Sequence, residues 1–171
     1  MAGDNQVTGI LNVAGAQTSA ELKDAIQSKR ITVFGVVNAS GKLKNSVRYD
    51  IKDAVMRVYS LDYIYYLEKG RKPGKRPPRS AIRQWIDDKG INPDGISKDS
   101  LAFLIQRKIG EEGTTIYKQG GSKLVADILP PAVNQVKNDL ILTFKNKTIA
   151  GYRSAITGQN GKWLQINSYP S

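Results

Sequence analysis

The chain has 171 residues and a formal net charge of +11, and it contains neither cysteine nor histidine. The missing residue types exclude disulfides, thiolate nucleophiles and imidazole bases, and with them most catalytic and metal-binding templates. No apolar run reaches the roughly 18 residues that a membrane span requires. A signal peptide has a basic region before its apolar stretch, and no such region precedes the short apolar stretch near this N-terminus. The sequence predicts one domain of ordinary size, with no cofactor, no metal site and no membrane contact.

The excess positive charge lies in one segment. Lys69 to Arg79 holds six basic residues and no acid, whereas the first 68 residues carry a net charge of +1 and the last 92 carry +4. A nearly neutral body with one basic segment indicates a directed contact with phosphate groups or with an acidic protein surface.

In chain order, residues 1–17 are rich in Gly, Ala, Asn and Gln and show no sustained hydrophobic period, so we expect an N-terminal arm. A helix is predicted to begin at Thr18 or Ser19, because acidic residues follow in its first turns and apolar residues recur at helical spacing. Ile31 to Val37 is β-branched enough to be a strand instead. Gly41 is expected to end this element and to be a structural anchor.

Two short alternating segments follow, around Tyr49 and Val58, and predict a hairpin that turns at Asp53-Ala54. The next stretch is dense in aromatic residues and contains Tyr63, Tyr65 and Tyr66. These tyrosines are a candidate base-stacking surface. Tyrosines beside a stiff loop more often pack against it and expose only their hydroxyl groups, and we expect that arrangement, with Tyr66 as an anchor.

Gly70 to Arg79, GRKPGKRPPR, is the most unusual stretch. Its three prolines remove backbone donors and fix φ near the extended value, so the segment cannot be helical. Its glycines and lysines do not have the spacing of a P-loop. We expect a stiff docking loop made by Gly70, Arg71, Lys72, Pro73, Gly74, Lys75, Arg76, Pro77 and Pro78. The candidate contacts to DNA or to an acidic partner are Lys69, Arg71, Lys72, Lys75, Arg76 and Arg79.

Two amphipathic helices are predicted after the loop. Ser80 is expected to cap the first, which places Trp85 on its apolar face as a core anchor. The second is expected to begin at Ser97 or Asp99, with the anchor Phe103 beside an apolar stripe and with glycines at its end.

The rest of the chain contains one further predicted helix. Thr114 to Lys123 is expected to be strand or loop, and Pro130-Pro131 can occupy the first turn of the last helix, within which Ile141 to Thr143 could equally be strand. The sequence therefore predicts an α+β fold, with a small antiparallel sheet packed against several helices and extended arms at the termini. Its expected parts are the arm 1–17, one domain at 18–157 and a C-terminal tail at 158–171.

The acidic residues give no sign of catalysis. Asp87-Asp88 and Glu111-Glu112 are the adjacent carboxylate pairs, and adjacent residues on a helix do not face each other. We expect them to be solvated or helix-end charges, and we expect the protein not to be an enzyme.

Several short motifs occur in a fixed order and together cover roughly Ala39 to Thr114. They are Asn38-Ala-Ser-Gly-Lys-Leu-Lys-Asn-Ser46, Tyr66-Leu-Glu-Lys-Gly-Arg-Lys-Pro-Gly-Lys-Arg-Pro-Pro78, Ile82-Arg-Gln-Trp-Ile86, Lys89-Gly-Ile91, Leu101-Ala-Phe-Leu-Ile-Gln-Arg-Lys-Ile109 and Gly113-Thr114. As an ordered set they resemble the neck or tail-completion family of tailed bacteriophages. The resemblance covers less than half of the chain, and it includes neither the N-terminal arm nor the region after Lys123.

The resemblance implies a small α+β subunit without catalytic activity. Such subunits form a ring, here expected to have six or twelve copies, which joins the DNA-filled head to the tail below the portal and lines the DNA passage. The implied partners are other copies of the chain, the portal, adaptor or tail proteins of the virion, and passing double-stranded DNA. The implied location is the virion neck, after assembly in the cytoplasm of the bacterial host.

A free-standing basic nucleic-acid-binding protein is the alternative interpretation. The six basic residues in eleven positions favour it. The basic loop has no aromatic residue, however, and neither a helix-turn-helix nor an RNA-binding signature surrounds it.

Overall fold

The computed structural model describes residues 2–28, 30–32, 35–36 and 40–157. Its elements are α1 (Ala2–Ser28), β1 (Arg30–Thr32), β2 (Gly35–Val36), α2 (Lys42–Ser46), β3 (Arg48–Lys52), β4 (Val55–Tyr59), α3 (Tyr63–Lys69), α4 (Arg79–Asp88), α5 (Lys98–Glu112), α6 (Thr115–Lys118) and α7 (Leu129–Thr157). The strands form two antiparallel pairs, β1 with β2 and β3 with β4. The predicted α+β class, with helices packed against a small antiparallel sheet, is confirmed.

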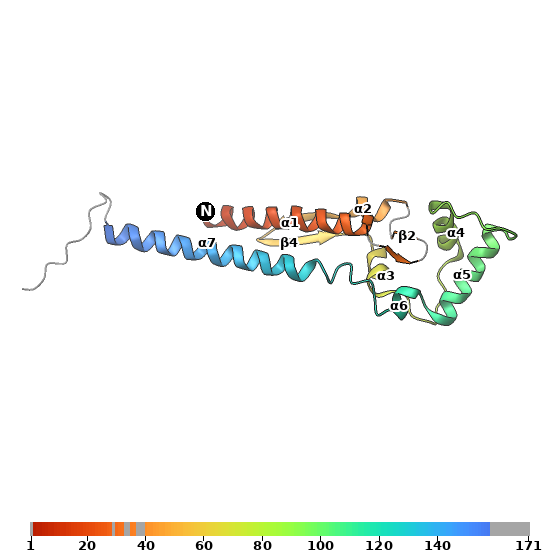
Figure 1. Cartoon of the computed structure of the whole chain (residues 1–171). Helices are drawn as coiled ribbons and strands as arrows, with labels where there is room; N and C mark the ends of the chain where they lie inside the picture. Colours follow the sequence, from red (N-terminus) through yellow and green to blue (C-terminus); the bar gives the residue numbers. More distant parts are fainter. Residues whose placement is uncertain (1, 29, 33–34, 37–39, 158–171) are drawn as a thin grey trace, which may run out of the picture.

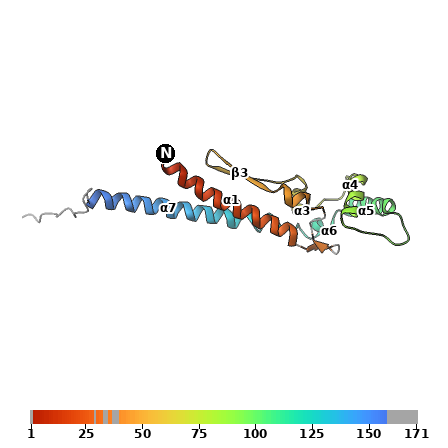
Figure 2. The same ribbon diagram turned by 90° about the horizontal axis from the view of Figure 1, so that it is seen from above.

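The elements form an elongated molecule (Figure 1). At one end, α1 lies between the β3–β4 hairpin and the long helix α7, as the view from above shows (Figure 2). At the other end, α4 and α5 pack against each other beyond α3 and α6. We call the first region the helical arm (α1, β3, β4 and α7) and the second the α4–α5 lobe.

The main core lies where these two regions meet. Its buried side chains come from the C-terminal half of α1, from α2 and the residue after it, from α3, from α6 and from the segment before α7: Leu22, Ile26, Leu43, Val47, Leu67, Ile116 and Leu124. Burying one such side chain contributes about 1.5–3 kcal/mol. In the α4–α5 lobe, whose two helices pack against each other, Ile86 and Ala102 are fully buried.

Residues 1–17 differ from the expected arm, because α1 begins at Ala2. Leu11 and Gly15 are buried within this first half of the helix. A Cβ at Gly15 would collide with the ring of Tyr49 on β3, so the glycine allows the hairpin to approach closely. Because a glycine rather than a large apolar residue makes this contact with Tyr49, the hydrophobic period of residues 1–17 is weak. Thr18 and Ser19, expected to begin the helix, are buried in its middle instead.

The next predictions are confirmed in part. β1 and β2 occupy parts of Ile31 to Val37, so the strand interpretation is correct for its described residues. The hairpin turns at Asp53 and Ala54, whose φ values of 54° and 55° both lie in the left-handed region, as in a type I′ turn. Gly41 does not end α1, which stops at Ser28; it precedes α2 with φ 78°.

Two predictions for the later helices are wrong: the cap of α4 and part of the element at 114–123. Pro78, extended at ψ 132°, precedes α4, so Ser80 lies inside that helix and does not cap it. Ser97 does cap α5, because its hydroxyl accepts a hydrogen bond from the Ser100 amide at 3.0 Å. Part of the predicted strand or loop at 114–123 is the helix α6, which begins where the Thr114 hydroxyl accepts a hydrogen bond from the Tyr117 amide.

α7 begins at Leu129 with Pro130 and Pro131 in its first turn, as predicted. It continues through Ile141 to Thr143 as helix, so the strand alternative there is wrong. The predicted tail 158–171 lies outside the described residues. No helix in the described part of the chain is long and apolar enough to cross a membrane.

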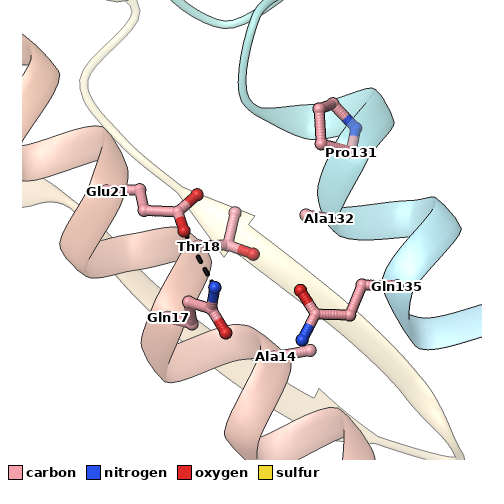
Figure 3. A pocket seen from close by; sticks show the side chains of 7 residues that line it. All are labelled: Ala14, Gln17, Thr18, Glu21, Pro131, Ala132 and Gln135. Carbon is pink, nitrogen blue, oxygen red and sulfur yellow. Dashed lines mark hydrogen bonds between the residues drawn. The ribbon is translucent and has the colours of Figure 1, made fainter. Parts of the chain in front are cut away.

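α1 and α7 are antiparallel neighbours, and Figure 3 shows the side chains that line a pocket between them. Ala14, Gln17, Thr18 and Glu21 of α1 and Pro131, Ala132 and Gln135 of α7 surround a cavity of about 50 Å³. Within α1, the Gln17 amide donates a hydrogen bond to the Glu21 carboxylate at 2.9 Å. α7 has no buried residue along its described length. Its contact with α1 therefore leaves most of its circumference uncovered.

Candidate docking surface around the basic loop

Hydrogen bonds hold the basic loop, Gly70 to Pro78, to residues that lie about 30 to 45 positions later in the sequence. The Gly74 amide donates to the Gly110 carbonyl at 2.7 Å, and the Gln106 side chain donates to the Pro77 carbonyl at 2.8 Å. Gly110 is in the last turn of α5, where carbonyls have no partner within the helix. The loop therefore completes the hydrogen bonding of this helix end and is itself fixed in shape.

A second clamp holds the start of the loop. The Thr114 amide donates to the Arg71 carbonyl at 2.9 Å, and the Arg71 amide donates to the Thr114 hydroxyl at 2.9 Å. Both bonds use the backbone of Arg71, so they do not engage its charged group. The same Thr114 hydroxyl caps α6, so one side chain joins the loop to the next helix.

Glycines allow these close approaches. Gly70 has φ 73°, and a Cβ there would collide with the backbone of Tyr117. Gly113 has φ 77°, and a Cβ there would lie 2.7 Å from the Arg71 carbonyl oxygen and 3.0 Å from Cδ of Pro73. Both positions require a left-handed backbone and no side chain. The glycines of the loop and of the end of α5 are thus parts of one contact.

The charged side chains of the loop point mainly to solvent. Lys69, Lys72, Lys75, Arg76 and Arg79 are exposed, and Arg71 is half-buried. The guanidinium of Arg71 lies 4.9 Å from the centre of the Tyr66 ring, and that of Arg79 lies 5.6 Å from the centre of the Phe103 ring. Such cation–π contacts orient a guanidinium without neutralising it. Arg79 also donates to the Asp99 carbonyl at 3.0 Å.

The loop lies next to the C-terminal end of α5, where the helix dipole presents partial negative charge. This placement lowers the electrostatic cost of bringing several cations together. The positive charges at the tip of the loop, Lys72 and Lys75, remain available to a partner.

The predicted anchors have different roles. Trp85 is half-buried in the α4–α5 lobe, where Ile86 beside it is the fully buried residue. Tyr66 and Phe103 are each about two-fifths exposed and cover the guanidinium groups of the loop rather than a hydrophobic core. Gly41 provides the left-handed residue before α2.

The tyrosines of α3 are more exposed than expected. Tyr66 packs against Arg71 as predicted, but Tyr65 is 62% exposed and Tyr63 is 49% exposed. Tyr65 and Tyr66 contact each other edge to face, with 5.7 Å between ring centres. An exposed aromatic surface therefore lies directly before the basic loop.

The acidic pairs are engaged in ion pairs. Asp87 pairs with Arg83 and, at 2.9 Å, with Lys98, and hydrogen bonds from these two cations lower its pKa to about 2. Lys118 pairs with Glu112 and lowers the pKa of that carboxyl. In the described part of the chain, no three His, Cys, Asp or Glu side chains gather as they would around a metal ion.

Three polar residues that hold this region were not singled out from the sequence. Gln106 and Thr114 bind the loop backbone, and Glu68 accepts hydrogen bonds from the Val125 and Ala126 amides at 2.8 and 3.2 Å. The signal was present for all three, since Glu68, Gln106 and Thr114 all belong to the ordered motifs. Their roles could not be assigned because their partners are distant in the sequence.

No family model matches the chain, and no curated protein or solved structure matches it. The function is therefore inferred from the geometry of the loop and from the motifs of the sequence.

Proposed function

We propose that the chain is a structural subunit of the neck of a tailed bacteriophage. In this proposal six or twelve copies form a ring that joins the DNA-filled head to the tail. The basic loop docks on a neighbouring subunit or on an adjacent portal, adaptor or tail protein, and double-stranded DNA passes through the ring. The protein acts in the virion and has no catalytic activity.

The observation that supports this proposal best is the convergence of the motifs. The Gly-Arg-Lys-Pro-Gly-Lys-Arg-Pro-Pro loop and the pair Gly113-Thr114 are more than 30 residues apart in the sequence. In the structure they meet, because Arg71 exchanges two hydrogen bonds with Thr114, and Gly74 bonds to the end of the intervening helix α5. The motifs that carry the resemblance thus build one preshaped loop.

A preshaped loop suits docking. Prolines and backbone hydrogen bonds fix the loop before a partner is bound, so little conformational entropy is lost on binding. Exposed lysines at the tip favour an acidic protein surface or phosphate groups. Both features are useful to a subunit whose task is assembly.

The test replaces the exposed charges of the loop and keeps its backbone clamps. Lys72→Ser, Lys75→Ser and Arg76→Ser are combined, and Arg71 is retained because it covers Tyr66. The control removes the same charge from exposed positions elsewhere, with Lys42→Ser, Lys52→Ser and Arg57→Ser. We expect electron microscopy to show unjoined heads and tails with the loop variant only. Normal joining by a folded loop variant would contradict the role of the loop.

The free-standing nucleic-acid binder is the second candidate, and the exposed rings of Tyr63, Tyr65 and Tyr66 beside the basic loop favour it. Base stacking on exposed tyrosines and phosphate contacts by lysines are the two components of single-strand binding. Fluorescence titration of the purified chain with DNA at several salt concentrations separates the candidates. Tight binding with a slope of several phosphates, together with absence from particles, would favour the binder.

A further inference from the structure

The chain exposes more surface than a compact protein of its mass. Its accessible surface is 12154 Å², whereas a folded monomer of 18.8 kDa exposes about 8300 Å². The elongated shape, in which the helical arm extends away from the core, contributes to this excess (Figure 1).

The distal half of α7 is one source of this excess. Leu142, Ile149, Tyr152 and Ile156 are spaced by seven, three and four residues, the spacing of a coiled-coil seam. All four are exposed, Tyr152 by 68% and Ile149 by 40%. We call them the α7 stripe. The spacing indicates that whatever covers the stripe is itself helical.

The chain's own α1 does not cover the stripe. The four side chains of the stripe are exposed, so α1 does not bury them. Gln135, which faces α1, lies seven residues before Leu142, so the stripe continues this side of α7 toward its C-terminal end. The two helices are antiparallel, since Ala132 of α7 lies near Thr18, and Thr143 lies near Gln6. The last turns of α7 therefore lie past the N-terminal end of α1, as both views show (Figures 1 and 2).

An open groove lies between α1 and α7 on the same arm. It has a volume of about 370 Å³ and is lined by Gln6, Gly9, Ile10, Val13, Asp139 and Thr143. A Cβ added at Gly9 would meet no atom within 4 Å, so the groove has room for large side chains. Val13, at its edge, is 67% exposed. We call this the arm groove.

Charge distinguishes the two surfaces. The segment from Ile141 to Thr157 contains Lys145, Lys147 and Arg153 and no acid. The charged residue in the groove lining is an acid, Asp139. Two α7 ends side by side would repel each other, whereas an α7 end and an arm groove attract.

We propose that the α7 stripe of one copy docks into the arm groove of the next copy. The contact joins unlike surfaces, so repetition about an axis produces a closed ring when the rotation closes. Each subunit then contributes its α7 stripe to one neighbour and its arm groove to the other. The inference rests on the ring-forming part of the proposed function and names the surfaces that form the ring.

Introduced cysteines test the contact directly, because the chain has no cysteine of its own. The double variant Val13→Cys with Tyr152→Cys, oxidised and run without reductant, should give a ladder of multiples of the chain. Each single variant should stay at the monomer position. A disulfide-linked dimer from Tyr152→Cys alone would show that two α7 ends lie side by side. No ladder from the double variant, in a sample that has assembled, would show that the stripe does not lie in the groove. Either result overturns the proposal.

A second experiment blocks the groove without disturbing the fold. Gly9→Leu fills the space beside Gly9 and improves helix propensity, so the monomer should stay folded while the association constant falls at least tenfold. Gly9→Ala is the matched control. Tyr152→Glu should have the same effect as Gly9→Leu, and Ser154→Glu, an exposed position outside the stripe, should not. Sedimentation velocity over a range of concentrations measures all four variants.

The outcomes separate this inference from the proposed function. If rings form and enter particles while Gly9→Leu and Tyr152→Glu assemble as well as the wild type, the docking of stripe into groove is wrong and the neck role is untouched. If the chain stays monomeric at every concentration and is absent from particles, both are wrong.

Discussion

The two ends of the molecule are stabilised in different ways. In the α4–α5 lobe a short loop is clamped by backbone and side-chain hydrogen bonds, and the lobe contains the fully buried residues Ile86 and Ala102. In the helical arm, α7 has 29 residues and none is buried. Isolated helices gain little stability without tertiary packing. The lobe is therefore stabilised by contacts within the chain, whereas α7 lacks such packing and is the surface that the proposed contact between subunits would cover.

The largest expected difference between the regions comes from truncating a large apolar side chain in each. Ile86→Ala should lower the free energy of unfolding by about 2–5 kcal/mol, because it leaves a cavity at a fully buried site. Leu142→Ala, on the exposed stripe, should change it by about 0.5 kcal/mol or less in the monomer. Urea unfolding followed by circular dichroism measures both. Equal costs would mean that α7 is packed within the monomer after all.

A glycine substitution in each region gives the next largest contrast. Gly70→Ala should destabilise the protein by about 2–3 kcal/mol, since the residue has φ 73° and its Cβ would collide with the Tyr117 backbone. Gly9→Ala should stabilise α1 by about 0.5–1 kcal/mol, because nothing obstructs its Cβ. Thermal unfolding of both variants checks the signs. A neutral Gly70→Ala would show that the loop can move away from α6.

Removing the Thr114 hydroxyl, which binds both the loop and the start of α6, should lower the stability by a smaller amount. Thr114→Ala should cost about 1–2 kcal/mol, because the Arg71 amide and the start of α6 both lose their acceptor. Thr114→Ser keeps the hydroxyl and should retain most of the stability. Hydrogen exchange should show faster exchange at Arg71 and Tyr117 in the alanine variant, with no change in α7. Faster exchange along α7 would contradict the independence of the two regions.

The smallest expected effect is the acid response of the lobe. Asp87 has a folded pKa of about 2, lowered by Arg83 and Lys98, compared with about 3.9 in an unfolded chain. A lowered folded pKa gives a contribution that is present above about pH 4 and is lost as the pH falls toward 2. Asp87→Asn should therefore make the stability of the lobe less dependent on pH in that window. An unchanged profile, measured by urea unfolding at each pH, would mean that the ion pairs contribute nothing.

The parts of the fold that depend on local signals could be predicted from the sequence. The prolines of Gly70 to Pro78 exclude a helix, Ser97 begins α5, and Pro130-Pro131 begins α7, because each acts through its own backbone or the next turn. The hairpin was predicted despite a weak turn signal at Asp53-Ala54, because alternation in the strands was sufficient.

The parts that depend on distant contacts could not be predicted. The first half of α1 is packed through Gly15 against Tyr49, a contact that leaves no hydrophobic period in the sequence. Ser80 has the composition of a cap, but the extended Pro78 sets the start of α4. The loop was identified from its own composition, whereas Gln106 and Thr114, which hold it, required the structure because they follow it by about 30 and 43 residues.

The carboxylate of Glu68 has a mechanical consequence. It accepts the amides of Val125 and Ala126 just before α7, and it lies two residues before the basic loop. α7 is about 43 Å long at 1.5 Å per residue. Its first turn follows the residues that Glu68 holds, so a small rotation there moves its far end by a large distance. A rotation of about 5° at the first turn of α7 displaces its C-terminal end by about 4 Å, roughly the width of a methyl group. The Glu68 carboxylate therefore helps, together with the contact between α1 and α7, to fix the direction in which α7 leaves the core.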